Sequence, residues 1–378
     1  MEQPQLTPRV VELFLELCAI PSPPGEERAV ADRSTRELDA IGLQWDEDGC
    51  GPAIGSTAGN ILCRLPGRGS EGGVPLFLCA HFDTVPLDGE LAPVLEEGLV
   101  RNAGGTILGA DDKSALAVMV ETARRVVEEV RPHAGIELLF TPMEEIGLLG
   151  AAAFDVSRLD ARIGYVYDQA APIGDVVVGS PTAQELEVVF VGRAAHAGMY
   201  PEEGRSAIVA AARAIADMPL GRIDEVTSAN VGVIRGGTAR NIVAERCVLD
   251  VEVRSHDDAR VTEVVQQILD SAAFAASLSE CTLETRVEPK YRGYRFRDDD
   301  LAVRLAVDAL GRAGFDARLG LSGGAADANV FNAKGLACVN LANGMTDIHT
   351  PDERIAVDDL ERMVDVTLAL VDAAYEAR

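Results

Sequence analysis

The chain has 378 residues, of which 47% are hydrophobic and 25% are charged, a composition typical of a soluble globular protein. At about 150 residues per domain, this length predicts two or three domains. Its 61 acidic and 34 basic residues give a formal net charge of −27, which argues against nucleic acid or an anionic membrane as a partner. No uncharged apolar run of about 18 residues occurs, which argues against a membrane span.

The first part of the chain alternates helical and strand patterns. Helices are expected at residues 7–18 and 25–41, separated by a proline-rich segment, 21–25, that cannot continue a helix. The next elements are expected to be strands at 60–65, 74–80, 136–141 and 163–167, with a helix at 114–130. Apolar strands separated by helices are typical of a mostly parallel sheet covered by helices on both faces, an α/β fold.

The pattern changes near residue 180, where residues 185–192 alternate like a strand with one wet face. The elements expected after it are a helix at 206–218, strands at 227–235 and 245–255, a helix at 257–277 and a strand at 281–288. This β-α-β-β-α-β order is the ferredoxin-like arrangement of an α+β domain.

The earlier pattern then returns. We expect helices at 299–313, 326–334 and from 357, and strands at 317–321 and 336–341. The sequence therefore predicts one α/β domain made of residues 1–180 and 296–378, interrupted by an inserted α+β domain at residues 181–295.

The strand at 74–80 leads directly into His81 and Asp83. On extended backbone these two side chains project to the same side. A carboxylate beside an imidazole fixes its tautomer, as is usual around a metal-bound histidine. A neutral buried pair would give the same short pattern.

Further acidic and imidazole side chains follow other predicted elements. Asp111 and Asp112 precede a helix, where an N-cap role is the alternative. Glu144 and Glu145 follow the strand at 136–141, Asp168 follows the strand at 163–167, and His349 lies in a loop after the strand at 336–341.

Five of these residues share one feature, because each falls just beyond the carboxyl end of a predicted core strand: His81, Glu144, Glu145, Asp168 and His349. In an open parallel sheet, ligands bind at that edge. Two imidazoles with several carboxylates suit zinc, with manganese or cobalt as alternatives. These are too many ligands for one tetrahedral ion, and they suit two ions that share a carboxylate.

Five segments of the sequence resemble the co-catalytic zinc peptidases and deacylases, a superfamily that includes glutamate carboxypeptidase, acetylornithine deacetylase and peptidase T. The segments are HFDTV (81–85), GADDK (109–113), EEIG (144–147), SGGAADANVF (322–331) and IHTPDE (348–353). The resemblance covers nearly the whole chain, and it is strongest to the peptidase T-like tripeptide aminopeptidases. It implies a zinc-exopeptidase-like catalytic domain with an inserted lid domain, and cleavage of the N-terminal residue of small peptides.

The resemblance also implies roles for individual residues. Asp111 would bridge two divalent ions, His81 and Asp168 would complete one site, and Glu145 and His349 the other. Asp83 would orient His81, Glu144 would be the general base, and a cis peptide is expected between Asp111 and Asp112. A base that is not itself a metal ligand explains why two adjacent glutamates divide the work.

The inserted domain holds His196, Asn241 and Arg254, which the resemblance makes candidates for gripping a substrate carboxylate or the tetrahedral oxyanion. As an alternative, they are turn and edge residues of a small sandwich. The resemblance further implies a homodimer through the inserted domain. An N-acyl amino acid deacylase, a dipeptidase or carboxypeptidase, and a non-catalytic peptide-binding protein are the alternative functions.

The seven cysteines are scattered without a CxxC pair, which favours free thiols in a reducing cytosol. Residues 1–5 lack the basic start and apolar run of a secretion signal. We therefore expect a cytoplasmic protein.

Overall fold

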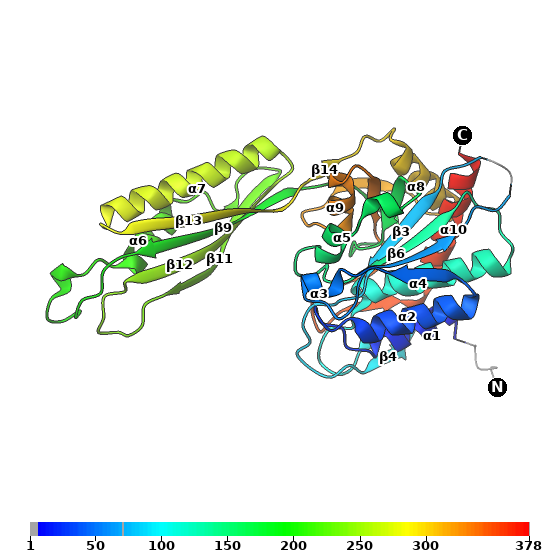
Figure 1. Cartoon of the computed structure of the whole chain (residues 1–378), viewed down its shortest axis with the longest axis horizontal. Coiled ribbons are helices and arrows are strands. Elements are labelled where there is room, and N and C mark those ends of the chain that lie inside the picture. Colours follow the sequence, from blue (N-terminus) through cyan, green and yellow to red (C-terminus); the bar gives the residue numbers. More distant parts are fainter. Residues whose placement is uncertain (1–6, 70–71, 378) are drawn as a thin grey trace. The chain divides into compact units, whose positions relative to one another are not determined.

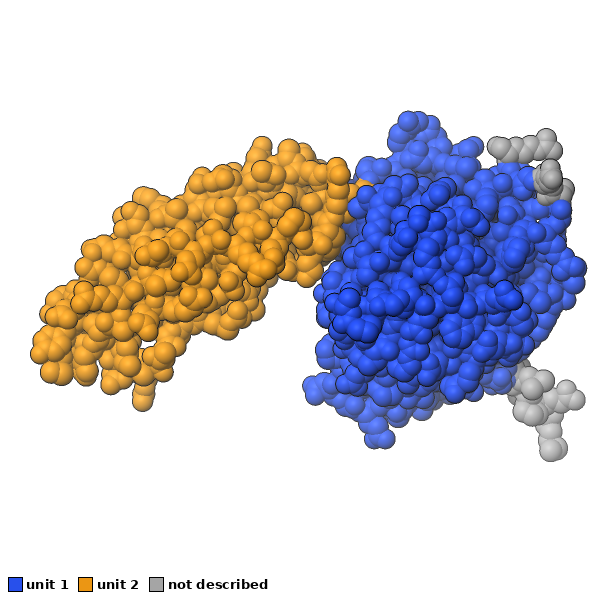
Figure 2. Space-filling view, in the orientation of Figure 1, with its two compact units in different colours: residues 1–179, 295–378 blue, residues 180–294 orange. Residues whose placement is uncertain are grey.

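The computed structural model describes residues 7–69 and 72–377. The chain divides into two compact units, one made of residues 1–179 and 295–378 and the other of residues 180–294 (Figure 2). Residues 1–5, where we looked for a secretion signal, lie outside the described part.

The first unit is built on a nine-stranded sheet (Figure 1). Its path runs β1 (Gln44–Glu47), β2 (Ile61–Leu65), β6 (Ile136–Thr141), β3 (Leu76–His81), β7 (Ile163–Val166), β16 (Ala337–Leu341), β8 (Asp175–Ser180) and β14 (Tyr294–Arg295), with β15 (Arg318–Leu321) beside β8. The central strands β6, β3, β7 and β16 are parallel, whereas β1, β2 and β8 join antiparallel. The predicted α/β class is confirmed, with a sheet that is mixed at its margins.

Helices cover both faces of this sheet, and the period-two alternation of β3 shows how. Leu76, Leu78 and Ala80 belong to a core shared with α1 (Arg9–Cys18), α4 (Ala110–Glu128), α8 (Leu301–Arg312) and α10 (Val357–Glu376). Phe77 and Cys79 face the other side, where the Phe77 ring meets Phe331 of α9 (Asp327–Ala333) edge-on at 5.2 Å. Because both faces are buried, all six residues of β3 are buried.

Smaller elements complete the first unit. They are α2 (Arg28–Ile41), α3 (Gly51–Ile54), α5 (Leu149–Ala153), the 3₁₀ turn Val156–Arg158 and a three-stranded sheet in the order β17 (Arg354–Ala356), β5 (Leu99–Asn102), β4 (Pro93–Glu96). Sequence patterns did not predict α5, β1, β8 or this small sheet.

The second unit is a four-stranded antiparallel sheet with a short edge addition and two helices. Its elements are β9 (Thr182–Val191), the 3₁₀ turn Pro201–Glu203, α6 (Ala207–Asp217), β10 (Gly221–Arg222), β11 (Thr227–Gly236), β12 (Arg246–Ser255), α7 (Asp258–Leu278) and β13 (Thr282–Tyr291). The order β10-β11-β12-β9-β13 places the first and third long strands at the centre. Leu186, Val188 and Phe190 pack with α6 and α7 in a separate core, so the β-α-β-β-α-β order is that of a ferredoxin-like unit.

Among residues 7–69 and 72–377, no helix combines the length and apolar character needed to cross a membrane.

Candidate metal centre

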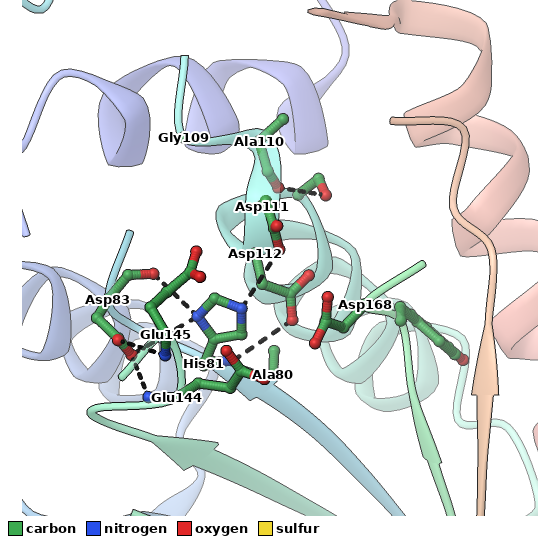
Figure 3. A network of polar contacts seen from close by, with 12 residues as sticks. Ala80, His81, Asp83, Gly109, Ala110, Asp111, Asp112, Glu144, Glu145 and Asp168 are labelled. Atoms are coloured by element: carbon green, nitrogen blue, oxygen red, sulfur yellow. Dashed lines mark hydrogen bonds and ion pairs between the residues drawn. The ribbon is translucent and has the colours of Figure 1, made fainter. Parts of the chain in front are cut away.

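Residues from four parallel strands and one helix meet at one edge of the main sheet. His81 is the last residue of β3, Asp168 follows β7 by two residues, and Glu144 and Glu145 come just after β6 (Figure 3). The elements that complete this edge are the start of α4, which carries Asp111, and the loop after β16, which carries His349. Figure 3 shows the carboxylates gathered around the His81 ring.

The Asp111 carboxylate presents one oxygen to each of the two imidazoles. Its Oδ1 lies 3.3 Å from His81 Nε2, and its Oδ2 lies 3.1 Å from His349 Nε2. Glu145 Oε1 lies 3.2 Å from the same nitrogen of His349. Ligand atoms about 2.1 Å from a tetrahedral ion are about 3.4 Å apart, so these spacings fit ligands turned toward shared ions.

Two groups of three residues could each hold a metal ion, because the ligand atoms within each group lie within 4.8 Å of one another. One group is His81, Asp111 and Glu145, and the other is His81, Glu144 and Asp168. Three of the atoms, His81 Nε2, Asp111 Oδ1 and Glu145 Oε1, are buried and have no hydrogen-bond partner among the described residues. Buried polar atoms rarely lack a hydrogen bond in folded proteins. Because they face one another, they fit a divalent cation, and the second group also places Glu144 within reach of this position.

Carboxylates outnumber imidazoles in this cluster: the carboxylates are Asp111, Glu144, Glu145 and Asp168, and the imidazoles are His81 and His349. Burial raises the pKa of Glu144 and Asp168 well above the usual value, and neighbouring carboxylates add to both shifts. The hydrogen bond to Asp111 and the ion pair with Glu145 raise the pKa of His349 to about 10. Burial opposes the charge on His81, yet Asp111 and Asp83 outweigh it and raise the pKa of that imidazole. The centre therefore attracts positive charge, whether protons or metal cations.

The Asp83 side chain holds the two glutamates. Its Oδ1 accepts the Glu144 backbone N–H at 2.9 Å, and its Oδ2 accepts that of Glu145 at 3.0 Å (Figure 3). His81 Nδ1 lies 2.9 Å from the backbone oxygen of Asp83 and 3.6 Å from its carboxylate. The backbone oxygen of Asp83 therefore makes the shorter contact with the ring. The Asp83 carboxylate, which the sequence suggested for this role, lies farther from it.

The expected cis peptide between Asp111 and Asp112 is confirmed. Asp111 and Asp112 have non-helical backbone angles, so regular helix begins after them. Asp112 Oδ2 accepts the backbone N–H of His81 at 3.4 Å.

A cavity of about 270 Å³ opens beside the cluster. Asp111, Glu144, Glu145, Asp168 and His349 line it, together with Gln169, Ala170, Ser322, Gly324, Ala325, Asn340 and Ile348. Such a volume suits a small ligand held at the acidic cluster.

The three candidates of the inserted segment do not form one cluster. The Ala197 N–H donates to Asn241 O at 2.9 Å, and His196 forms a β-bridge with Ile242, so His196 and Asn241 lie on adjoining loops. Arg254 lies near the end of β12, where it bonds Glu252. The loop of His196 follows the end of β9, which pairs with Arg246 at the start of β12. Arg246 and Arg254 are eight residues apart along β12, so the two ends of the strand are about 26 Å apart.

Sequence reasoning missed several polar residues that support the cluster. Asn340 bonds the backbone of Asp168, Glu353 bonds the segment before Asp111, and Asp327 lies buried beside Thr141. An asparagine inside an apolar strand pattern was one usable signal for Asn340. Glu353 and Asp327 lie in two of the segments that carry the family resemblance, but the sequence did not show what they contact, because their partners lie far away along the chain.

An α/β sheet with imidazoles and carboxylates gathered at the carboxyl ends of its parallel strands defines a metal-dependent hydrolase site. A family model described as peptidase family M20/M25/M40 matches residues 77–373. The chain belongs to this family and is a metallopeptidase.

Individual relatives agree with this assignment. The chain is 37% identical over 366 residues to the uncharacterized protein YqjE of Bacillus subtilis, covering 97% of this chain and 98% of that protein. The structure of aminopeptidase PepT from Bacillus cereus is 36% identical with a TM-score of 0.89, and that of a tripeptidase from Staphylococcus aureus is 35% identical with a TM-score of 0.92. Each structural match covers 97% of this chain and 98% of the other. The predicted resemblance to the peptidase T-like branch is confirmed.

Proposed function

We propose that this metallopeptidase removes the N-terminal residue of tripeptides and uses two divalent cations to do so. The observation that carries the proposal is the Asp111 carboxylate, which directs one oxygen to His81 and the other to His349. The two structural relatives named an aminopeptidase and a tripeptidase support the substrate class.

In this proposal Asp111 is the shared ligand, His81 and Asp168 complete one site, and Glu145 and His349 complete the other. Zinc is the proposed ion, with manganese or cobalt as alternatives, because all three accept imidazole and carboxylate ligands. When bound, the ions lower the pKa of a water molecule and polarise the scissile carbonyl.

Glu144 is the proposed general base. It is buried, lines the cavity beside the ligands, and is fixed through its backbone N–H by Asp83. It would take a proton from the attacking water and return it to the leaving amine. Glu144 must be ionised to act as a base, and positive charge held by the neighbouring ligands would lower the pKa of its carboxylate toward that state.

His196, Asn241 and Arg254 are proposed to contact substrate. A tripeptide spans about 10 Å when extended, whereas the level of Arg254 on β12 is about 26 Å from that of His196. One bound tripeptide cannot reach both, so we propose a homodimer in which one of these groups acts in the partner's site. Exposed Val209 and Ile234 of the inserted segment supply apolar surface for such a contact.

Mixing two inactive variants tests the homodimer. If His196 acts in the partner's site, subunits with Glu144→Gln and subunits with His196→Ala would form mixed dimers that contain one intact site. Activity would then reappear on mixing after dissociation. A monomer in light scattering, or a mixture that stays inactive, would contradict the shared site.

Peptide assays test the substrate class. Chelator-treated protein is expected to be inactive and to regain activity with zinc, manganese or cobalt, with kcat/KM at least tenfold higher for trialanine than for dialanine or N-acetylalanine. A preference for N-acetylalanine would indicate the deacylase, and a preference for dialanine would indicate a dipeptidase. Absence of any chelator-sensitive turnover would indicate a binding protein.

We also propose a cytoplasmic location. All seven cysteines lie within the described residues and are free thiols, as expected in a reducing compartment. Fractionation of the native cells that places the protein outside the cytoplasm would contradict this.

A further inference from the structure

The loop that carries His349 needs an anchor. The imidazole is 45% exposed, and its Nε2 is held by the Asp111 and Glu145 carboxylates. Asp347 and His349 adopt left-handed backbone angles, with φ of 55° and 63°, which non-glycine residues hold only where the surroundings impose them. The ends of the loop are joined by the reciprocal backbone bonds between Thr346 and Arg354.

Glu353 lies at the end of this loop and is 1% exposed. Its Oε2 accepts the backbone N–H groups of Leu108 and Gly109, each at 2.7 Å, and its Oε1 accepts that of Asp111 at 3.1 Å. Bonds from N–H groups to a carboxylate are stronger than those to a neutral acceptor. One side chain therefore ties the loop of His349 to the segment that ends at Asp111, 242 residues earlier in the chain.

We infer that Glu353 is a positioning residue that sets His349 against Asp111 and so determines the affinity of the ion held by His349, Asp111 and Glu145. The inference rests on the proposed use of two ions. Glu353 would not touch an ion or the substrate, because all three of its bonds are to backbone N–H groups.

The other site has a separate support, which supplies the matched control. The ladder between β7 and β16 ends at the pair Val166–Asn340. Beyond it, Asn340 Oδ1 accepts the Asp168 N–H at 3.0 Å, and its Nδ2 donates to Asp168 O at 2.6 Å. Asn343 Nδ2 likewise donates to Tyr167 O at 2.7 Å. The side-chain amides of Asn340 and Asn343 thus bond the backbone just beyond the end of β7, where strand pairing has stopped, and they hold Asp168 in place.

Cobalt titration of the chelator-stripped full-length protein tests the inference. Cobalt binds more weakly than zinc, which makes two separate affinities measurable. In the Glu353→Gln variant, the amide nitrogen would face backbone donors in place of a carboxylate oxygen. The wild type is expected to take up two ions, and the variant to bind one of them about 10–100-fold more weakly while the other changes less than threefold.

Double variants identify which ion is affected. In a His349→Ala background, Glu353→Gln is expected to add less than a threefold loss, because that site has already lost its ligand. In an Asn340→Ala background, it is expected to add its full loss, because the two changes act on different ions. A variant that weakens both ions equally, or neither, would overturn the inference.

Two controls keep the test decisive. If Glu353→Gln does not fold, as judged by circular dichroism, Glu353→Asp retains the charge on a shorter side chain and is expected to weaken the same ion; unchanged cobalt binding by this variant would overturn the inference. Trialanine hydrolysis is measured separately. A wild type that binds two ions but cleaves no peptide refutes the proposed function alone, whereas one that binds fewer than two ions refutes both.

Discussion

A buried carboxylate next to the metal centre is expected to destabilise the ion-free protein at neutral pH. Asp327 is 2% exposed. Its Oδ2 accepts the Thr141 hydroxyl at 2.5 Å, and its Oδ1 has no hydrogen-bond partner among residues 7–69 and 72–377. Burial raises the pKa of Asp327 from 3.8 to about 6. We predict that Asp327→Asn stabilises the ion-free protein at pH 8.

The size and sign of this effect follow from proton linkage. Because the folded protein holds the proton more tightly than the unfolded chain, the stabilisation is complete below pH 3.8 and is lost as pH rises through 6. A shift of about two pKa units corresponds to about 3 kcal/mol. Asp327→Asn should therefore raise the free energy of unfolding by about 3 kcal/mol at pH 8 and by about half as much at pH 5.

Urea unfolding of chelator-stripped protein at both pH values measures the difference. The exposed Asp298 offers a matched control, for which replacement by Asn should change stability by less than about 0.5 kcal/mol at either pH. An Asp327→Asn protein that is no more stable than the wild type at pH 8, or whose advantage does not vary with pH, would refute the reasoning.

Three further predictions concern the centre and the sheet beneath it. Glu144→Gln should retain both ions by metal analysis but lower kcat by about 10²–10⁴-fold; near-normal turnover would remove Glu144 from the mechanism. Glu145→Ala should lose one bound ion, and full metal content would show that Glu145 is not a ligand. Gly164→Ala should cost at least about 1–3 kcal/mol in urea unfolding, because the new Cβ would lie 2.1 Å from the buried Phe77 ring. Gly311 occupies an exposed position of α8 with open space around its Cβ, so Gly311→Ala should be neutral or stabilising by up to about 1 kcal/mol, and equal effects of the two substitutions would contradict this packing argument.

The strand ends were predictable from the sequence because burial of both faces produces near-continuous apolar runs. The apolar run of β3 ends directly before His81, and that of β6 ends a few residues before Glu144. The polar residues that follow each run can therefore be assigned to the ligand-binding edge. β8 (Asp175–Ser180) was missed, although its sequence, DVVVGS, holds a short apolar run.

The supporting contacts were beyond sequence reasoning. Glu353 and Asn340 bind backbone groups of residues that the fold brings near from more than 170 positions away, and a side chain's bond to a distant backbone leaves no local periodicity. The Asp83 carboxylate, expected at the His81 ring, is instead closer to the backbone of the two glutamates. Short motifs thus identified the residues of the centre, while three-dimensional contacts were needed to assign what each side chain holds.

A crystal structure of the zinc-loaded protein, with diffraction recorded at the zinc absorption edge, tests the central claim most directly. Two anomalous peaks about 3–4 Å apart are expected on either side of the Asp111 carboxylate. One should lie within about 2.2 Å of His81 Nε2 and an Asp168 oxygen, and the other within the same distance of His349 Nε2 and a Glu145 oxygen. A single peak, or a pair that Asp111 does not bridge, would contradict the two-ion account.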